Sequence, residues 1–516
     1  MTRTMKWLGA LALLVGAGYL GFQQYKIYLP GIIGEWREPI AENRPISWAQ
    51  GPAVAPSGER PPNVILIVAD DLGYNDVGFQ GARDIPTPHL DALARAGTRF
   101  TSGYVSAPYC SPSRAGFLTG RYQTKFGHEF NPHVGDEATL GLPLAERTIA
   151  DHLRASGYAT GLIGKWHQGF NAAHHPQSRG FDDYFGFLVG AHNFALRREA
   201  APKFGTANSQ NLIYRGRQVQ PLDGFATTVF TDEAIAFTER HSAQPWFLYL
   251  AYNAVHTPLE IDPAVAARVP AAVTDPARRG YLALLLGLDD SIGRLRAHLE
   301  KTSRTKDTLI VFFSDNGGAG RKPFFAYNTG VNTPFRGDKG QVLEGGIRVP
   351  GAISWPGVIP AGKTYDEPVA SMDFMPTILE AAGLPLPKDQ PTDGLSLLKQ
   401  LKTGAPLGRN AIYWHFPCYI GKGEPMSLLR AGDYKLIQKF AGPTFELYNV
   451  KKDPSEEHDL AKSDPAKVEE LKKLLLAWQK DTGAFLADKK NEAYDPNAKE
   501  QRGGGKGGQG GGKKKK

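Results

Sequence analysis

The feature that most limits the possible folds is a set of short, continuous apolar runs. The first, residues 63–69 (NVILIVA), is rich in β-branched residues and is bounded by prolines and acidic residues. Such a run predicts a strand that is buried on both faces, as in a sheet covered by helices on both sides. Similar runs occur at residues 159–163, 246–251 and 308–313.

Amphipathic stretches separate these runs and predict helices at residues 88–96, 148–155 and 281–300. Strands that alternate with helices indicate a largely parallel α/β sheet. The chain has 516 residues, of which 41% are hydrophobic. This is enough for a large domain with a sizeable core and a second, smaller domain.

The pattern changes after about residue 394. Short strand candidates follow one another at residues 411–415, 427–430, 434–438 and 445–449, and residues 465–482 predict a helix. This order is typical of a small antiparallel sheet with one packed helix. We therefore expect an N-terminal segment at residues 1–38, a linker at residues 39–62 and a catalytic domain at residues 63–394. A small α+β subdomain should follow at residues 395–496, and a disordered Gly/Lys tail at residues 497–516.

The N-terminus predicts export. Arg3 and Lys6 precede an apolar run at residues 7–22, which is longer than a usual signal-peptide core and shorter than a usual membrane span. Because no small-x-small cleavage site follows, an uncleaved membrane anchor is favoured over a cleaved peptide. Either interpretation places the catalytic domain on the periplasmic or extracellular side.

The net charge of +8 does not indicate a nucleic-acid partner. Five of the lysines lie in the terminal run at residues 503–516, so the rest of the chain carries only a small positive excess. No nucleic-acid-binding module accompanies that excess. An anionic substrate or a membrane surface explains the net positive charge better.

Polar side chains follow two of the predicted strands directly. Asp70 and Asp71 come after the first strand, and Asp315 and Asn316 come after the strand at residues 308–313. In open α/β sheets, ligands bind at these strand ends. Carboxylate and amide oxygens form a hard ligand set that suits Ca²⁺ or Mg²⁺. The alternative is that one aspartate caps the following turn.

A second motif contains one of only two cysteines. It runs from Cys110 to Arg114 (CSPSR), with Pro112 near the first turn of a predicted helix. Free N–H groups at such a helix start attract anions, and Arg114 adds a guanidinium for a tetrahedral oxyanion. Cys110 could instead be an inert buried thiol, or pair with Cys418 in a disulfide.

Cationic and titratable residues lie in turn-like contexts elsewhere. They are Lys165, His167, His256 and Lys339. Each alone is typical of a surface residue or a satisfied polar contact. As a set, they provide positive charge for an oxyanion and two imidazoles for proton transfer.

In their order and spacing, these motifs closely resemble the type I, formylglycine-dependent sulfatases of the alkaline phosphatase superfamily. The resemblance extends from about residue 63 into the C-terminal sheet. Its most specific part is Cys110 to Arg114 with the following residues 118–120 (LTG), the sequence that the family's maturation enzyme reads. It implies an alkaline-phosphatase-like fold, with a large mixed, mainly parallel sheet flanked by helices and a smaller antiparallel sheet with a packed helix.

The resemblance also implies the chemistry of each residue. Cys110 would be oxidised to formylglycine, whose hydrated aldehyde attacks sulfur with one hydroxyl and releases sulfate with the help of the other. One Ca²⁺ would be bound by Asp70, Asp71, Asp315, Asn316 and the modified Cys110. Arg114 and Lys165 would hold the formylglycine hydroxyls, and His167 would take the proton that triggers release. His256 would protonate the leaving alcohol, and Lys339 would contact the sulfate.

The substrate is the least constrained part of the predicted function. Residues 127–131 and 185–194 look more like the sugar-acting bacterial members, so we expect a carbohydrate sulfate from a polysaccharide. His192 falls where relatives often contact the substrate. Trp414 and His415 of the small subdomain are expected to line the pocket.

Three alternatives remain open. They are an arylsulfatase acting on small phenolic sulfates, a formylglycine-dependent phosphonate monoester or phosphodiester hydrolase, and an inactive binder of sulfated glycans in which Cys110 stays a thiol. Gln168 stands where the family commonly has an apolar residue, and no catalytic consequence is expected. Cys418 is expected to be a half-buried apolar residue.

Overall fold

A computed structural model describes Tyr19 and most of the chain after residue 59. The described residues are Tyr19, 60–132, 141–196, 212–220, 222–320, 329–420, 423–440, 442, 444–489, 491–492 and 494. Nearly all of the apolar run at residues 7–22 and of the expected linker, and the whole Gly/Lys tail, lie outside them, so their roles stay predictions. No helix in the described part is long and apolar enough to cross a membrane.

Within this part of the chain, the largest sheet has ten strands in the order β13-β2-β12-β11-β1-β10-β4-β5-β7-β8. Strands β11, β1, β10, β4 and β5 run parallel to one another, and β12 is antiparallel to β11. The ten strands are β1 (Asn63–Ala69), β2 (Thr98–Phe100), β4 (Ala159–Lys165), β5 (Asp183–Phe187), β7 (Tyr214–Arg215), β8 (Gln218–Val219), β10 (Trp246–Ala251), β11 (Thr308–Ser314), β12 (Gly351–Ser354) and β13 (Lys363–Tyr365). The mixed, mainly parallel sheet confirms the expected fold class.

Alternate residues of the central strand β1 enter two separate cores. Val64 and Leu66 belong to one hydrophobic cluster, whereas Ile65 and Ile67 belong to the other. This explains why the strand is apolar without interruption, since both faces are covered. The first face packs against α4 (Cys110–Thr119), α5 (Ile149–Ala155) and α10 (Phe374–Ala381), and the second against α3 (Pro88–Arg95), α6 (Ala226–Arg240) and α8 (Pro276–Lys301).

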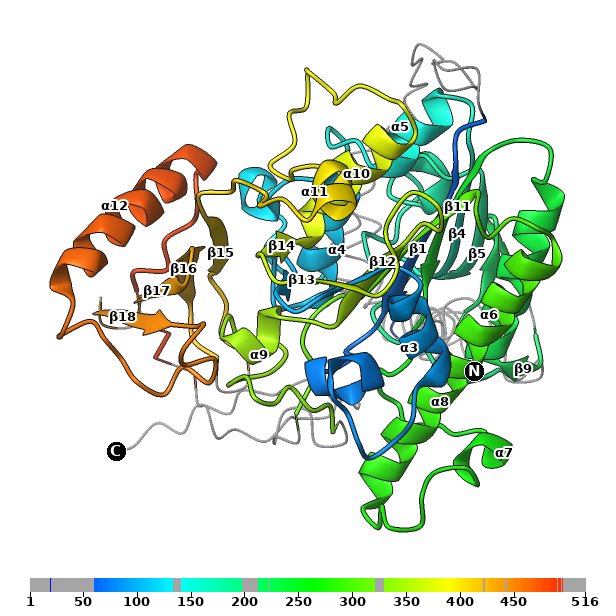
Figure 1. Cartoon of the computed structure of the whole chain (residues 1–516), viewed down its shortest axis with the longest axis horizontal. Coiled ribbons are helices and arrows are strands. Elements are labelled where there is room, and N and C mark those ends of the chain that lie inside the picture. The colour runs from blue at the N-terminus through cyan, green and yellow to red at the C-terminus, as the bar shows by residue number, and fades with distance from the viewer. Residues whose placement is uncertain are drawn as a thin grey trace, which may run out of the picture.

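A four-stranded antiparallel sheet forms the C-terminal subdomain, at one end of the molecule in Figure 1. Its strands are β15 (Ile412–Phe416), β16 (Met426–Ala431), β17 (Tyr434–Lys439) and β18 (Thr444–Asn449), and α12 (Pro465–Thr482) packs against β16 and β17. Asp464 caps the start of α12, and Gly483 ends it with a left-handed conformation. The predicted small sheet with one helix is confirmed.

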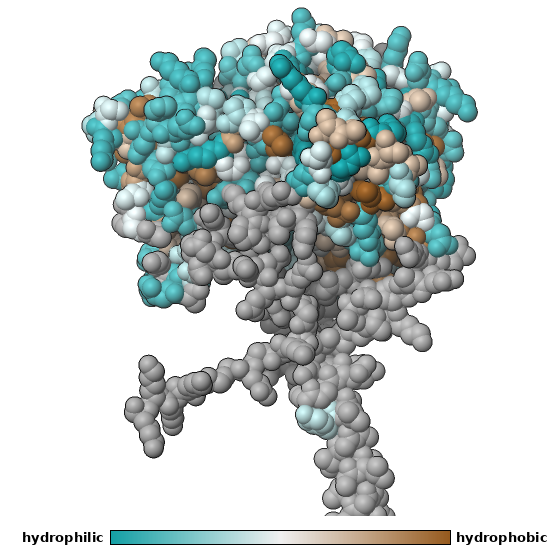
Figure 2. All heavy atoms as spheres, turned by 90° about the horizontal axis from the view of Figure 1, so that it is seen from below, coloured by the Kyte–Doolittle hydropathy of each residue, from teal (hydrophilic) through white to brown (hydrophobic). Residues whose placement is uncertain are grey.

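Several short elements complete the fold. They are β3 (Gly103–Tyr104), β6 (Ala195–Leu196), β9 (Gly224–Phe225), β14 (Val369–Ala370), α7 (Pro263–Ala266), α9 (Glu344–Ile347) and α11 (Leu398–Thr403). Figure 2 shows the described surface of one face, which is mostly hydrophilic with small apolar areas between polar residues. Isolated apolar residues are normal on a folded protein.

Candidate active site

The predicted polar residues gather at one edge of the large sheet. Strands β1, β4, β10 and β11 are parallel neighbours, so their carboxyl ends lie side by side; Ala69 pairs with Ser314, and Ala251 pairs with Gly164. The residues that follow these four ends are Asp70, Asp71, Trp166, His167, His256, Asp315 and Asn316. The expected placement of these residues at strand ends is confirmed, and their role in binding a ligand stays a prediction.

Three aspartates are buried together at this edge. Asp70, Asp71 and Asp315 are each at most 2% exposed. The backbone N–H of Asp71 donates to Asp315 Oδ1 (3.2 Å), and Asp71 has a left-handed backbone with φ of 62°. Asn316 Nδ2 donates to Asp71 Oδ1 (2.8 Å). Buried carboxylates at such short range need positive charge beside them.

The guanidinium of Arg114 supplies part of that charge. Its Nε and Nη2 donate to Asp315 Oδ2 at 3.0 and 2.8 Å, and Nη2 lies 3.8 Å from Asp70 Oδ1. Nη1 donates to the hydroxyl of Tyr249 on β10 (2.8 Å). Arg114 is completely buried, and the Tyr249 hydroxyl, with the carboxylates of Asp315 and Asp70, outweighs burial and raises its pKa. Its charge is therefore permanent and its orientation fixed.

Two lysines supply the remaining positive charge beside the aspartates. Lys165 Nζ donates to Asp70 Oδ2 (2.7 Å), and Lys339 Nζ lies 2.7 and 2.9 Å from the two carboxylate oxygens of Asp71. Although burial alone would lower it, the pKa of Lys339 is raised well above its usual value by Asp71. Each of two aspartates thus faces its own ammonium group.

The aspartates respond differently to these neighbours. Burial, together with the charge of Asp315, raises the pKa of Asp70 to about 7 despite Lys165. Burial would also raise the pKa of Asp71, but Lys339 and His256 lower it to about 2. The pKa of Asp315 is held below its usual value by Arg114 against the effect of burial. A cation bound here would favour the ionised form of all three.

Cys110 is the first residue of α4 and points into this cluster. Its Sγ lies 3.8 Å from Asp70 Oδ1 and is 1% exposed. Burial raises the pKa of the thiol to about 12, so at neutral pH it is protonated and a weak nucleophile. Cys110 and Cys418 are both free thiols, so no disulfide joins them, and Cys418 is half-buried as expected.

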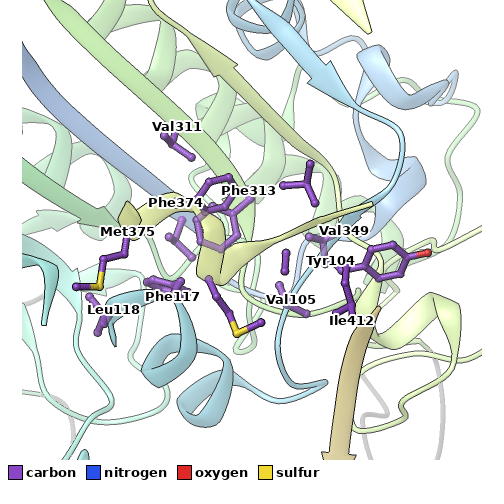
Figure 3. Packing of buried hydrophobic residues seen from close by; sticks show 14 of the residues in the cluster. Tyr104, Val105, Phe117, Leu118, Val311, Phe313, Val349, Phe374, Met375 and Ile412 are labelled. Carbon is purple, nitrogen blue, oxygen red and sulfur yellow. The ribbon is translucent and has the colours of Figure 1, made fainter. Parts of the chain in front are cut away.

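Buried side chains of α4 pack directly against the large sheet. All ten residues of the helix are buried. Phe117 packs edge-to-face on Phe313 of β11 (centroids 5.0 Å apart), and Phe313 contacts Phe374 (4.8 Å), as Figure 3 shows. The position of Cys110 is therefore set by a rigid core and not by a surface loop.

Two histidines complete the edge. His256 Nε2 lies 3.7 Å from Asp71 Oδ2, and burial, with a contribution from Lys339, lowers the pKa of His256 to about 4. Burial and the neighbouring cations also lower the pKa of His167 well below its usual value. His167 Nδ1 has no hydrogen-bond partner among the described residues. Both imidazoles are neutral at neutral pH in this state.

Trp414 and His415, the two residues of the small subdomain expected at the substrate pocket, are both buried. Trp414 is 1% exposed, and its Nε1 donates to the carbonyl of Val105 (2.6 Å). His415 is fully buried, and its Nδ1 lies 2.6 Å from Ser427 Oγ. Both side chains are buried, and Trp414 packs against Tyr104 of the catalytic domain; that the two residues line the substrate pocket stays a prediction. His192 is 4% exposed and packs against Phe187, and its role in substrate binding stays a prediction.

Sequence reasoning missed several residues around the nucleophile. Tyr249, Ser111 and Gln168 are buried and bond to Arg114 or to the backbone of His167, and His128 bonds to the hydroxyl of Ser111. Gln168 carried a signal as a departure from the apolar residue usual in the family, and Ser111 and His128 lie in segments already noted, but no role was predicted for any of them. The others are ordinary residue types whose partners lie far away in the sequence.

The donor set fits a hard divalent cation. Oxygen atoms of Asp70 and Asp315 lie within 4.8 Å of each other and of Cys110 Sγ. Asn316 is fully buried, and its Oδ1 accepts no hydrogen bond from any residue that the structure describes. A buried carbonyl oxygen without a donor is well suited to ligate a metal, and oxygen ligands of this kind suit Ca²⁺ or Mg²⁺.

Comparison with known proteins agrees with this geometry. The family described as "Sulfatase" matches residues 62–384, and the family described as "N-sulphoglucosamine sulphohydrolase, C-terminal" matches residues 336–481. The chain is 33% identical to the steryl-sulfatase of Mus musculus over 440 residues, covering 71% of this chain and 69% of that one. It is 33% identical to the N-acetylgalactosamine-6-sulfatase of Sus scrofa over 390 residues, covering 73% and 71%.

A solved structure gives the same result. Ps i-CgsB superposes with a TM-score of 0.76 at 34% identity, covering 83% of this chain and 94% of that chain. A family match over more than half of the chain, and relatives of this identity and coverage, settle the membership. With its alkaline-phosphatase-like fold, this chain belongs to the sulfatase family, whose members are sulfuric ester hydrolases.

Proposed function

We propose that this protein hydrolyses carbohydrate sulfate esters, with formylglycine made from Cys110 and one bound Ca²⁺. The observation that carries the proposal is the convergence of a buried Cys110, three aspartates and three fixed cations at one sheet edge. A sulfate ester carries one negative charge on its free oxygens, and more charge develops on the bridging oxygen as the bond breaks. Buried cations at fixed positions stabilise that charge without reorganisation.

Ca²⁺ would be held by Asp70, Asp71, Asp315, Asn316 and the modified residue 110. When bound, it lowers the pKa of a coordinated hydroxyl and neutralises sulfuryl oxygens. Arg114 already fixes Asp315 with two hydrogen bonds, so this carboxylate keeps its orientation. Lys165 lies on the Asp70 side of residue 110, and Lys339 on the Asp71 side, where each can hold an anionic oxygen.

The two histidines suit proton transfer. His167 is neutral and its Nδ1 is unpaired among the described residues, so it can accept a proton from a hydroxyl at residue 110. His256 is neutral while the site is empty of substrate, but an anionic sulfate beside it would raise its pKa. It could then donate a proton to the leaving alcohol.

Two observations support a carbohydrate substrate. Ps i-CgsB, 34% identical to this chain, has been solved in complex with k-i-k-neocarrahexaose, and another relative is an N-acetylgalactosamine-6-sulfatase. A steryl-sulfatase has the same 33% identity to this chain as the N-acetylgalactosamine-6-sulfatase, so a small hydrophobic sulfate ester is the second candidate substrate.

A release assay with the mature protein tests the proposal. The panel contains desalted sulfated oligosaccharides, 4-methylumbelliferyl sulfate and an aryl phosphonate monoester, each with and without Ca²⁺. We expect sulfate release to be fastest from an oligosaccharide, and the peptide containing residue 110 to have the mass of formylglycine. Turnover confined to the aryl sulfate would overturn the carbohydrate assignment. An unmodified thiol in fully active protein would overturn the mechanism.

Export is part of the same proposal, because polysaccharide-derived substrates are met outside the cytoplasm. Its support is the basic, apolar N-terminus at residues 3–22. Fractionation of cells that make the full chain, followed by carbonate washing of membranes, separates an anchored from a released form. Recovery in the cytoplasm would contradict export.

A further inference from the structure

A buried polar cluster lies directly behind the nucleophile. It consists of Ser111, His128, Asn131 and Gln168, and we refer to it as the Ser111 cluster. Ser111 and Gln168 are fully buried, and His128 is 7% exposed. Three separate segments contribute: the first turn of α4, the loop after residue 126 and the residues that follow β4.

Ser111 is the centre of the cluster. Its Oγ donates to the carbonyl oxygen of His167 (2.5 Å) and accepts from Gln168 Nε2 (3.0 Å). His128 Nε2 lies 2.7 Å from the same Oγ. The backbone N–H of Ser111 donates to Asn131 Oδ1 (2.9 Å). Every polar atom of the residue next to Cys110 on the helix thus has a side-chain or backbone partner outside α4.

Gln168 connects the same helix to His167. Its Nε2 lies 2.9 Å from the carbonyl oxygen of Ser111 and 2.9 Å from that of His167. One amide group therefore touches the backbone on both sides of the site. The backbone carbonyl oxygen of Gln168 accepts a hydrogen bond from the N–H of Leu142 (3.0 Å), which connects this segment to the loop at Leu142.

The segment held in this way is under backbone strain. His167 has φ of 58°, a left-handed conformation that is rare for a non-glycine residue. Its N–H donates to the carbonyl of Leu188 (3.0 Å), and its own carbonyl receives the bonds from Ser111 and Gln168. Gly190 lies against the imidazole, where an added Cβ would come within 2.7 Å of the ring. A strained residue stays in place only when its surroundings fix it.

Packing alone does not explain Gln168. Its Oε1 accepts no hydrogen bond from the described residues although the side chain is fully buried. A buried, unsatisfied polar atom destabilises a fold relative to an apolar side chain of the same shape. By contrast, Nε2 bonds to Ser111 and His167, so the polar part of the side chain is directed at the two catalytic segments.

We infer that Gln168 and Ser111 are positioning residues that couple the helix carrying residue 110 to His167. His128 fixes the hydroxyl of Ser111 from the other side. The inference rests on the proposed function for the roles of residue 110 and His167. It adds a physical link between them, which sets the distance between nucleophile and proton acceptor.

The test compares Gln168→Leu and Ser111→Ala with the wild type. The panel ester that the wild type hydrolyses fastest is the probe, and rates are expressed per modified chain, with modification of residue 110 counted by mass spectrometry. We expect each variant to lower kcat by about tenfold to a hundredfold while KM changes by less than about twofold, since sub-ångström misplacement affects the chemical step most. The double variant should be no slower than the slower single one.

Hydrogen exchange provides a readout that needs no activity. We expect both variants to raise exchange in the peptides covering residues 110–114 and 166–169 together. Gln390→Leu is the matched control, because it removes a buried glutamine whose side chain bonds the backbone of Arg147 (2.8 and 3.0 Å) and not either of these two peptides. It should leave kcat and both peptides unchanged.

A kcat within about twofold of wild type in both variants, or unchanged exchange in either peptide, would overturn the coupling. If the wild type hydrolyses no ester in the panel, the proposed function fails. The exchange data then decide the coupling alone.

Discussion

Cys110 lies among three carboxylates and three cations, yet its thiol stays protonated at neutral pH because burial raises its pKa to about 12. The proposed formylglycine hydrate would instead place two hydroxyls at this position, one to attack sulfur and one to release sulfate, whereas a thiol offers no second group for release. The residue at position 110 therefore decides whether the surrounding groups can act.

Replacing Cys110 by serine should separate attack from release. Cys110→Ser offers one hydroxyl but no second one to expel sulfate, so we expect at most about one equivalent of alcohol per chain and no steady release of sulfate. Cys110→Ala should release neither. Rapid-quench measurement of alcohol, with mass spectrometry confirming serine at position 110, checks this. Continuous turnover by a chain that retains serine would contradict the two-hydroxyl chemistry.

Removal of the metal should destabilise the protein. Asp70, Asp71 and Asp315 come together only in the folded chain, so Ca²⁺ should bind the folded form and shift the equilibrium toward it. At a free Ca²⁺ concentration about a hundred times Kd, the expected gain is about 2.7 kcal/mol. Melting curves in EGTA and in excess Ca²⁺ measure the gain.

Asn316→Ala provides the control for metal binding. It removes the unpaired amide oxygen, and we expect it to reduce the Ca²⁺-dependent rise in Tm. Equal rises in the variant and the wild type would exclude Asn316 as a ligand.

Sequence reasoning placed the strand-end residues correctly but not their supports. Asp70 and Asp315 each directly follow a strand, so the parallel sheet itself brings them together. Ser111 and Gln168 meet only because α4 packs beside the end of β4, a contact between segments more than fifty residues apart. Their partners depend on side-chain rotamers, which no local pattern encodes.

Among the elements, the strongly periodic ones were predicted best. The observed α12, Pro465–Thr482, has the bounds expected from sequence, and β1 and β10 match as well. Short strands such as β12 and β13 were missed because three or four residues carry little periodicity. No local pattern indicated how deeply Trp414 is buried, because β15 is buried along most of its length and lacks the usual alternation.

A buried charge network connects the two sheets. Lys435 on β17 lies 3.0 Å from Glu344 and 2.8 Å from Glu456, and all three are at most 1% exposed. The N–H of Glu344 donates to Glu456 Oε2 (2.9 Å). Glu344 begins α9, whose Gly346 carbonyl accepts from the N–H of Gly317, next to Asn316. The subdomain is thereby bonded to the loop that borders the site.

Lys435→Met should therefore destabilise the fold strongly. The substitution leaves two buried carboxylates without their ammonium group, which costs about 3–5 kcal/mol. Urea unfolding followed by tryptophan fluorescence measures the change in the free energy of unfolding.

A surface pair on the same strand gives the comparison. Lys439 pairs with Glu446, and both are partly exposed. Lys439→Met should cost less than about 1 kcal/mol. Similar losses of unfolding free energy in the two variants would show that the buried network stabilises the fold no more than the surface pair does.

Across the whole molecule, buried histidines should make stability sensitive to acid. Burial lowers the pKa of five described histidines outside the strand-end site to about 4, namely His128, His152, His174, His175 and His415. Between about pH 6.5 and 4, the unfolded chain binds protons at these positions and the folded chain does not. Stability is therefore lost as the pH falls through this window.

Buried carboxyl groups act in the opposite direction, because burial raises the pKa of Glu129 to about 8 and also raises the pKa values of Asp76, Asp151, Asp289 and Glu456. We expect the five imidazoles, whose unfolded-state pKa lies within the window, to outweigh them. We expect Tm to fall steadily from pH 7 to pH 5 in scanning calorimetry, with Ca²⁺ present throughout. His415→Gln should make the decline shallower. A Tm that is constant over this range would contradict the burial of these imidazoles in their neutral form.

The complete burial of α4 also limits when the proposed oxidation of Cys110 can happen. Since the sulfur and the whole CSPSRAGFLT segment are enclosed by the finished fold, an enzyme can reach them only on a chain that has not yet closed around them. Maturation and folding would then compete in time, and each chain that folds first would be lost to catalysis. Rapid overproduction would yield well-folded but inert protein, so the specific activity of a preparation would report the speed of its synthesis.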